Sequence, residues 1–107
     1  MEDDTTPVDP EDVVLTNGML GYNILLNGEY VGAIEGIPGE IQFIEVELPL
    51  QGKGIGRAAV NEFIALSRAH NVSEVTTNNV THPAMEHILE SKGFERRSEE
   101  IGWIKEI

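Results

Sequence analysis

Residues 44–72 read IEVELPLQGKGIGRAAVNEFIALSRAHNV, and this stretch decides the fold. Its first residues alternate between apolar and charged, which is typical of a strand, and the residues after the glycine-rich segment place apolar side chains at helical spacing up to about His70. Glycines let a backbone approach a ligand closely. The first turn of a helix adds unpaired N–H donors and the positive end of the helix dipole. The stretch therefore predicts a strand, an anion-binding loop and a helix.

Two other nucleotide-binding loops do not fit the glycine-rich segment. A P-loop requires Gly-x-x-x-x-Gly-Lys followed by Ser or Thr, but Arg57 and Ala58 follow Gly56. A dinucleotide fingerprint requires a parallel βαβ unit, but the strands before this loop are predicted to be joined by hairpins. Two of the seven basic residues, Lys53 and Arg57, lie in this segment, which favours the binding of an anion. The alternative is a glycine-rich turn that only caps the helix.

Upstream of the loop, the sequence predicts antiparallel strands at 22–26, 30–34 and 40–47. Asn27-Gly28 is a strong hairpin signal between the first two, and residues 37–39 form a second turn. Alternation predicts two faces for the third strand. One face holds Gln42, Ile44 and Val46, and the other holds Ile41, Phe43, Glu45 and Glu47. Residues 13–15 form a possible edge strand within an acidic, flexible tail at 1–16, so the domain spans 17–107.

Downstream of the loop, β-branched residues at 75–77 predict a buried strand. A second helix follows at 83–92, where Pro83 suits the first helical position and Gly93 the end. Residues 94–97 and 101–107 form a final pair of strands. This order of elements predicts an α/β fold with a mixed, mostly antiparallel sheet flanked by two main helices.

Composition limits the partners and the compartment. The net charge of -12, from 19 acidic residues against 7 Lys and Arg, disfavours binding to nucleic acid. No apolar run approaches the roughly 20 residues of a membrane span, and the acidic start does not suit a signal peptide. With no cysteine, the expected compartment is the cytoplasm. The acidity fits a halophilic protein or an ordinary acidic one, and such a surface could attract a cationic amine.

Two segments carry a resemblance to a known family. Residues 44–72 resemble motif A of the Gcn5-related N-acetyltransferases (GNAT), and residues 83–94, PAMEHILESKGF, resemble motif B. The resemblance covers about residues 22–107 and implies a GNAT-like arrangement of the sheet and helices. It also implies that acetyl-CoA is the co-substrate and that an acetyl group passes directly from the thioester to an amine.

The resemblance assigns roles to individual residues. The backbone of Ile44 to Val46 would bind the pantetheine, and the loop amides and cations would bind the pyrophosphate. The implied cofactor-binding residues are Ile44, Val46, Gln51, Gly52, Lys53, Gly54, Ile55, Gly56 and Arg57.

Catalysis is harder to assign. Many members of the family carry a Tyr acid four residues before the Gly of motif B, whereas this chain has Leu89 there. Glu40, which starts the third strand and is expected on the face of Val46, is the candidate base, with a turn carboxylate as the alternative. The histidines are not expected to bind a metal, because His82 and His87 fit a shared face poorly. Tyr22 and Tyr30 are expected to pack on strands, and Trp103 in the core or a pocket.

We therefore expect an acetyl-CoA-dependent N-acetyltransferase that acts on a small amine or a protein amine. The family's usual first strand and first two helices, which wall the acceptor site, are expected to be missing, so a second chain could complete the site in a homodimer. The alternative is a non-catalytic domain that binds CoA, or an interaction module with the same fold.

Overall fold

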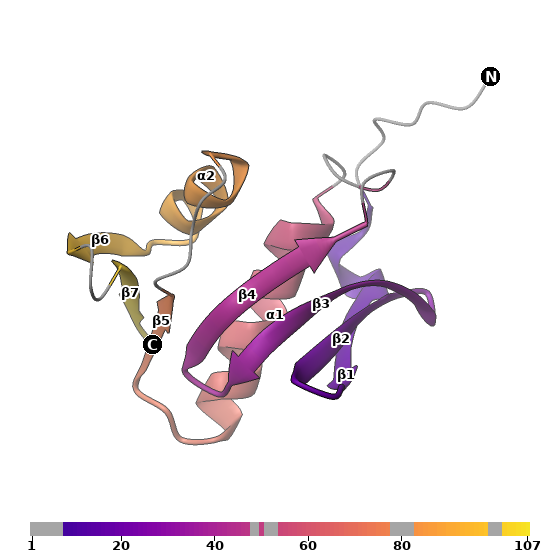
Figure 1. The fold of residues 1–107 in the computed structure, drawn as a ribbon, viewed down its shortest axis with the longest axis horizontal. Coiled ribbons are helices and arrows are strands. Elements are labelled where there is room, and N and C mark those ends of the chain that lie inside the picture. Colours follow the sequence, from indigo (N-terminus) through magenta and orange to yellow (C-terminus); the bar gives the residue numbers. More distant parts are fainter. Residues whose placement is uncertain (1–7, 48–49, 51–53, 78–82, 99–101) are drawn as a thin grey trace.

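The structure is a computed structural model that describes residues 8–47, 50, 54–77, 83–98 and 102–107. It is a single seven-stranded sheet with the order β1-β2-β3-β4-β5-β7-β6 and two α-helices (Figure 1). All strand pairs are antiparallel except β4 with β5. The elements are η1 (Pro10–Asp12), β1 (Val13–Asn17), β2 (Gly21–Leu26), β3 (Glu29–Ile37), β4 (Glu40–Val46), α1 (Ile55–Ala69), β5 (Glu74–Thr77), α2 (Pro83–Ser91), β6 (Glu95–Ser98) and β7 (Gly102–Glu106).

Local sequence explains the first part of the sheet. Asn27 and Gly28 both have positive φ, at 52° and 85°, as the tight turn between β2 and β3 requires. Gly39, with φ 88°, turns β3 into β4. The predicted hairpins and the mostly antiparallel α/β class are thus confirmed. The sheet also includes the end of the predicted tail (1–16), because β1 is paired with β2 and Val13 is only 1% exposed.

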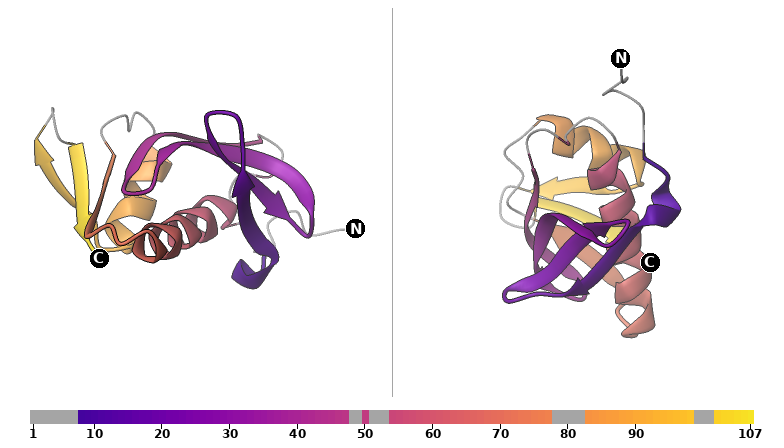
Figure 2. Two further views of the ribbon diagram at one scale, coloured as in Figure 1. Left: turned by 90° about the horizontal axis from the view of Figure 1, so that it is seen from below. Right: turned by 90° about the vertical axis from the view of Figure 1, so that its right-hand side faces the viewer.

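The core lies between α1 and one face of the sheet (Figure 2). Phe63 of α1 is fully buried and meets Tyr22 of β2 edge to face, with ring centroids 6.0 Å apart. The second helix adds Leu89, which is also fully buried. The buried apolar residues are Val13, Ile24, Val31, Ile34, Ile41, Ile55, Ala58, Ala59, Val60, Phe63, Ile64, Val75, Leu89, Phe94 and Trp103.

The predicted alternation along β4 is wrong before Phe43, because β4 contains a β-bulge. Glu35 pairs with Phe43 and Gly36 with Ile41, so Gln42 has no opposite residue in β3. An extra residue of this kind reverses the faces beyond it. Ile41 is therefore buried at 3% exposure, on the same side as Ile44, while Gln42 is exposed.

The parallel pairing of β4 with β5 joins, among the described residues, Glu40 to Thr76 and Ile41 to Thr77. The described part of β5 stops at Thr77, and β4 continues to Val46. Gly39 fixes this end of the pair. Its amide donates to Ser67 Oγ of α1 at 3.0 Å, and its carbonyl accepts from the amide of Thr76 at 2.9 Å. We call Gly39, Ser67 and Thr76 the pinning junction.

None of the described helices is both long enough and apolar enough to cross a membrane.

Candidate functional site

The best candidate site is the start of α1, where Gly54 opens the helix. Gly54 is the N-cap with φ 88°, a left-handed conformation that favours glycine, and no side chain of the described residues caps this end of the helix. A Cβ added to Gly54 would meet no atom of the described part of the chain within 4 Å. The first turn contains no acidic residue, and Arg57 in it is exposed. The helix start therefore combines open space, a nearby cation and amides that lack helical acceptors.

Gly56 has a different surrounding. A Cβ at this position would lie 3.3 Å from Ile88 Cδ1 of α2, so Gly56 lets the two helices pack closely. The sequence pattern grouped both glycines as anion-binding residues. In the structure, glycine is favoured at position 54 by its positive φ and at position 56 by the close packing of α1 against α2. The packing contact involves a residue more than thirty positions away, so the loop pattern alone does not predict it.

The remaining predicted cofactor-binding residues lie partly inside and partly outside the described part of the chain. Ile44 and Val46 lie on β4 upstream of the loop, partly buried against the core, and Val46 pairs with Gly32 of β3. Ile55 is 1% exposed, so its side chain is part of the core and is not available to a ligand. Gln51, Gly52 and Lys53 lie outside the described residues.

The two positions relevant to catalysis differ in accessibility. Leu89 is fully buried in the core, so the position corresponding to the family's usual acid faces the protein interior. Glu40 is exposed, and its Oε1 accepts a hydrogen bond from Gln42 Nε2 at 3.5 Å. Because of the bulge, Glu40 does not share the face of Val46, contrary to the sequence prediction. Its role as a base stays a prediction.

The other candidates are distributed over the fold. Within the described residues, no group of three or more His, Asp or Glu could hold a metal ion. His70 caps the end of α1, and His87 is exposed, whereas His82 lies outside the described residues. Tyr22 packs on Phe63 as predicted, but Tyr30 is 55% exposed. Trp103 belongs to the core.

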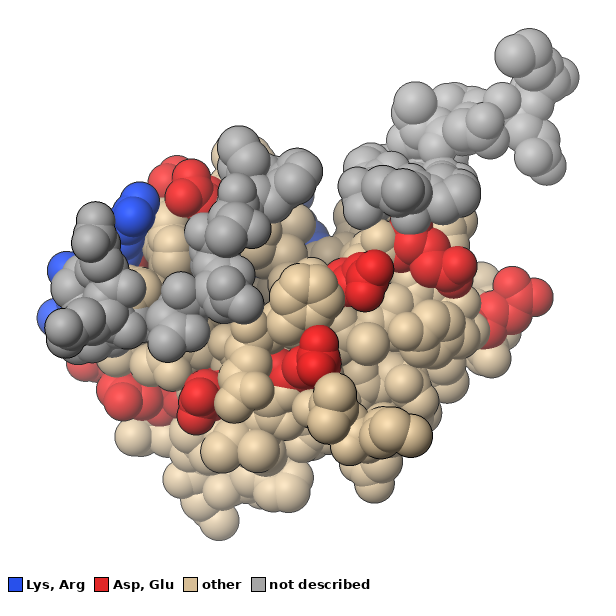
Figure 3. Space-filling view, viewed as in Figure 1, with Lys and Arg blue, Asp and Glu red and all other residues tan. Residues whose placement is uncertain are grey.

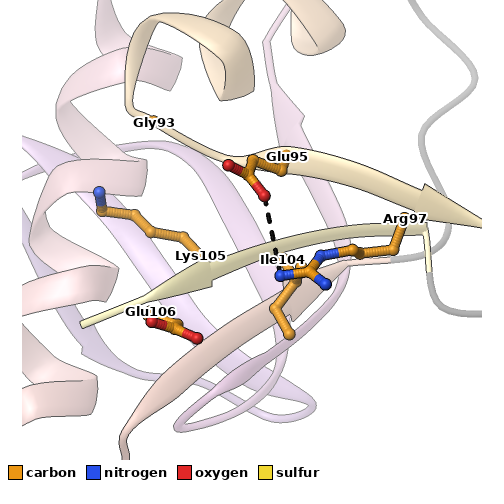
Figure 4. A pocket seen from close by; sticks show the side chains of 6 residues that line it. All are labelled: Gly93, Glu95, Arg97, Ile104, Lys105 and Glu106. Atoms are coloured by element: carbon orange, nitrogen blue, oxygen red, sulfur yellow. Dashed lines mark ion pairs between the residues drawn. The ribbon is translucent and has the colours of Figure 1, made fainter.

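A shallow pocket of about 300 Å³ lies over β6 and β7 (Figure 4), at the β6 edge of the sheet. Its charges are balanced. Arg97 forms an ion pair with Glu95 at 3.7 Å, and Lys105 and Glu106 lie nearby. None of the predicted cofactor-binding residues lines it; the lining residues are Gly93, Glu95, Arg97, Ile104, Lys105 and Glu106.

Charge is divided unevenly along the chain. The first 52 residues hold 11 of the 19 acidic residues and no Lys or Arg, so all seven basic residues lie from Lys53 onward. Figure 3 shows carboxylates across the β1–β4 part of the molecule and Lys and Arg mainly near β6. The sequence alone shows this uneven distribution of charge, but only the folded sheet shows that the acidic residues of β1–β4 lie in one part of the molecule.

No protein-family model and no curated protein matches this sequence.

Proposed function

We propose that this chain is a minimal acetyl-CoA-dependent N-acetyltransferase in which the start of α1 binds the pyrophosphate of the cofactor. The observation that carries the proposal is the left-handed, sterically open Gly54 at the N-terminus of a fifteen-residue helix with no acidic residue in its first turn. A diphosphate there would accept hydrogen bonds from first-turn amides and gain from the helix dipole. The exposed Arg57 would add a charge-assisted bond.

The arrangement of β4 and β5 supports the same proposal. Within the described residues the two strands are parallel and pair Glu40 with Thr76 and Ile41 with Thr77, at the end remote from the loop. From Ile41, β4 runs on toward the start of α1. In this proposal an extended pantetheine arm lies along this part of β4 and places the thioester near the paired ends of the two strands. The acceptor amine would attack the thioester carbonyl, form the amide and release the CoA thiol, with the amine proton passing to a base.

The second candidate function is a CoA-binding domain without catalysis. It is favoured by Leu89, which is fully buried at the position of the family's usual acid. A leucine has no proton to donate, so the leaving thiolate would have to be protonated by water or by another group. Loss of a general acid costs about 10²–10⁴-fold in such a step.

The direct test of binding is calorimetry with acetyl-CoA on the unmodified protein, Gly54→Ala and Gly28→Ala. Gly28 is a matched control, because it has nearly the same φ (85°) and also has no atom within 4 Å of an added Cβ. Both changes strain the backbone by about 1–2 kcal/mol, so they should destabilise the fold equally. We expect only Gly54→Ala to weaken acetyl-CoA binding, by at least about tenfold. Equal affinities for the two variants would exclude the proposed site.

A second pair of variants tests the cation. Arg57 and Arg68 are both exposed and lie near opposite ends of α1. Arg57→Gln should weaken binding by about three- to tenfold, as expected for loss of one solvent-exposed hydrogen bond with a net value of about 0.5–1.5 kcal/mol, and Arg68→Gln should leave it unchanged.

Catalysis is separated from binding by following CoA thiol release with a panel of amines: a diamine, a lysine-containing peptide and a peptide with a free N-terminus. Steady release at a rate above that of the buffer would exclude the non-catalytic reading. If Glu40 is the base, Glu40→Gln should lower kcat by about 10²–10⁴-fold with unchanged acetyl-CoA affinity, while Glu74→Gln, also at an exposed strand start, should have no effect.

A further inference from the structure

The face of β1–β4 that is turned away from α1, which we call the outer face, has no described element packed on it (Figure 2). In an antiparallel sheet covered on one side, side chains on the solvent side are usually polar. Here several are large and apolar, with Val14 51%, Tyr30 55%, Ile37 60% and Phe43 43% exposed.

Strand register shows that these side chains share the outer face. Val14 pairs with Leu25, which pairs with Tyr30, so the three form one row across β1, β2 and β3. Closer to the β3–β4 turn, Phe43 pairs with Glu35, and Ile37 pairs with Glu40. The row between them contains Asn23, Ala33 and Glu45. The apolar side chains therefore lie in two groups along the outer face, and between them are Ala33, the polar Asn23 and the carboxylate of Glu45.

The outer face has charge of one sign. Glu35, Glu40 and Glu45 lie on it, and β1–β4 contain no Lys or Arg. In the described residues, none of these three carboxylates forms an ion pair. The ion pairs of the second half instead join Arg96 to Glu86 at 3.8 Å and Arg97 to Glu95 at 3.7 Å, so the cations of the chain's own β6 already have partners.

We propose that the outer face is a docking surface for an amphipathic helix of another protein, with Lys or Arg flanking its apolar stripe. Helices are the usual cover for the apolar face of a sheet, and cations would complement the three carboxylates. A second copy of this face would repel the first, and the chain's own first seven residues, which include Glu2, Asp3 and Asp4, would be repelled for the same reason. Charge therefore selects a cationic partner. This inference is independent of acetyl-CoA binding.

The dimensions of the surface set the length of the partner. Tyr30 and Ile37 are seven positions apart on β3, which corresponds to roughly 20 Å of strand. A helix rises 1.5 Å per residue, so about 14 residues cover that span and a probe of about 18 residues covers it fully.

The test is a titration of ¹⁵N-labelled protein, followed by amide chemical shifts, with a Leu/Lys peptide of about 18 residues whose leucines form one helical stripe. Two control peptides accompany it: the same residues permuted so that the leucines surround the helix, and a Leu/Glu peptide with the original stripe. We expect shifts concentrated in β1–β4 and an affinity for the striped Leu/Lys peptide at least about tenfold above that of either control.

Variants identify the surface. Tyr30→Ser combined with Phe43→Ser should weaken binding by at least about tenfold. Glu35→Gln combined with Glu45→Gln should weaken it by about three- to tenfold at low salt and less at high salt. The matched pair Glu62→Gln and Glu90→Gln, on the helices, should change little.

Three outcomes would overturn the proposal: equal binding of the permuted peptide, shifts spread over all acidic regions, or insensitivity to the outer-face variants. Sedimentation of the free protein tests whether a second copy of the chain covers the outer face. Self-association that broadens the same β1–β4 amides would assign the surface to a second copy instead.

Discussion

The two faces of the β1–β4 sheet carry similar residue types in opposite surroundings. On the inner face, Ile24 and Ile34 are fully buried under α1, and Tyr22 contacts Phe63. On the outer face, Tyr30 and Phe43 are about half exposed, and the carboxylates of this face form no ion pair among the residues that the structure describes. Stability is therefore concentrated on one side of this sheet, while the other side retains apolar area available for recognition.

Loss of the main aromatic contact on the inner face should destabilise the protein more than any change on the outer face. Phe63→Ala should lower the free energy of unfolding by about 3–5 kcal/mol, because Phe63 is fully buried and neighbouring side chains refill such a cavity only in part. Urea denaturation followed by circular dichroism measures the loss. Phe63→Leu, which keeps most of the volume, should lose less; equal losses for the two variants would contradict a cavity origin.

The next largest effect concerns the pinning junction, which ties α1 to the inner side of the sheet. Ser67→Ala should cost about 1–3 kcal/mol, because Ser67 is fully buried and the Gly39 amide would lose its acceptor. The same denaturation experiment applies. Ser73→Ala, at an exposed position, is the control, and it should leave stability unchanged.

A smaller effect is expected from salt on the outer face. Raising the salt concentration from 0.1 M to 1 M shortens the Debye length from about 10 Å to about 3 Å, so repulsion among the acidic residues weakens and the melting temperature should rise. The combined Glu35→Gln and Glu45→Gln variant should gain about 0.5 kcal/mol at low salt and show a shallower salt dependence. A salt dependence identical to that of the unmodified protein would place the repulsion elsewhere.

The smallest effect is expected for Phe43→Ser. Because Phe43 is 43% exposed and lies opposite Glu35 rather than under a helix, its loss should change the free energy of unfolding by less than about 0.5 kcal/mol. A loss comparable to that of Phe63→Ala would mean that the outer face is covered in solution, for example by a second copy of the chain.

Local chemistry made much of the fold predictable. Asn27 and Gly28 determine their hairpin because both residue types readily adopt the positive φ that the turn requires. The spacing of apolar residues in α1 likewise predicts that Phe63 lies on the buried face. The bulge at Gln42 was not predictable, because it depends on how β4 pairs with Gly36 of β3. A single inserted residue then reversed the faces of Ile41 and Glu40 relative to strict alternation.

The candidate site divides in the same way. The glycine pattern predicts a turn before α1, and Gly54 has the left-handed conformation that such a turn favours. The sequence could not predict that Gly56 lies against Ile88, because that contact requires α2 to pack beside α1. The carboxylates of the outer face were visible as residues, but only the strand register places them among exposed apolar side chains.

The pinning junction also bears on the order in which this chain assembles. The β1–β2 and β2–β3 hairpins join residues close in sequence, so their closure costs little entropy. The junction instead connects Gly39 with Ser67 and Thr76, at separations of 28 and 37 residues. We expect the β1–β4 meander to form first and β5, β7 and β6 to join only after α1 has docked. In native-state hydrogen exchange, the amide of Thr76 should therefore lose protection together with β7, at a lower free energy than the amides of β2 and β3.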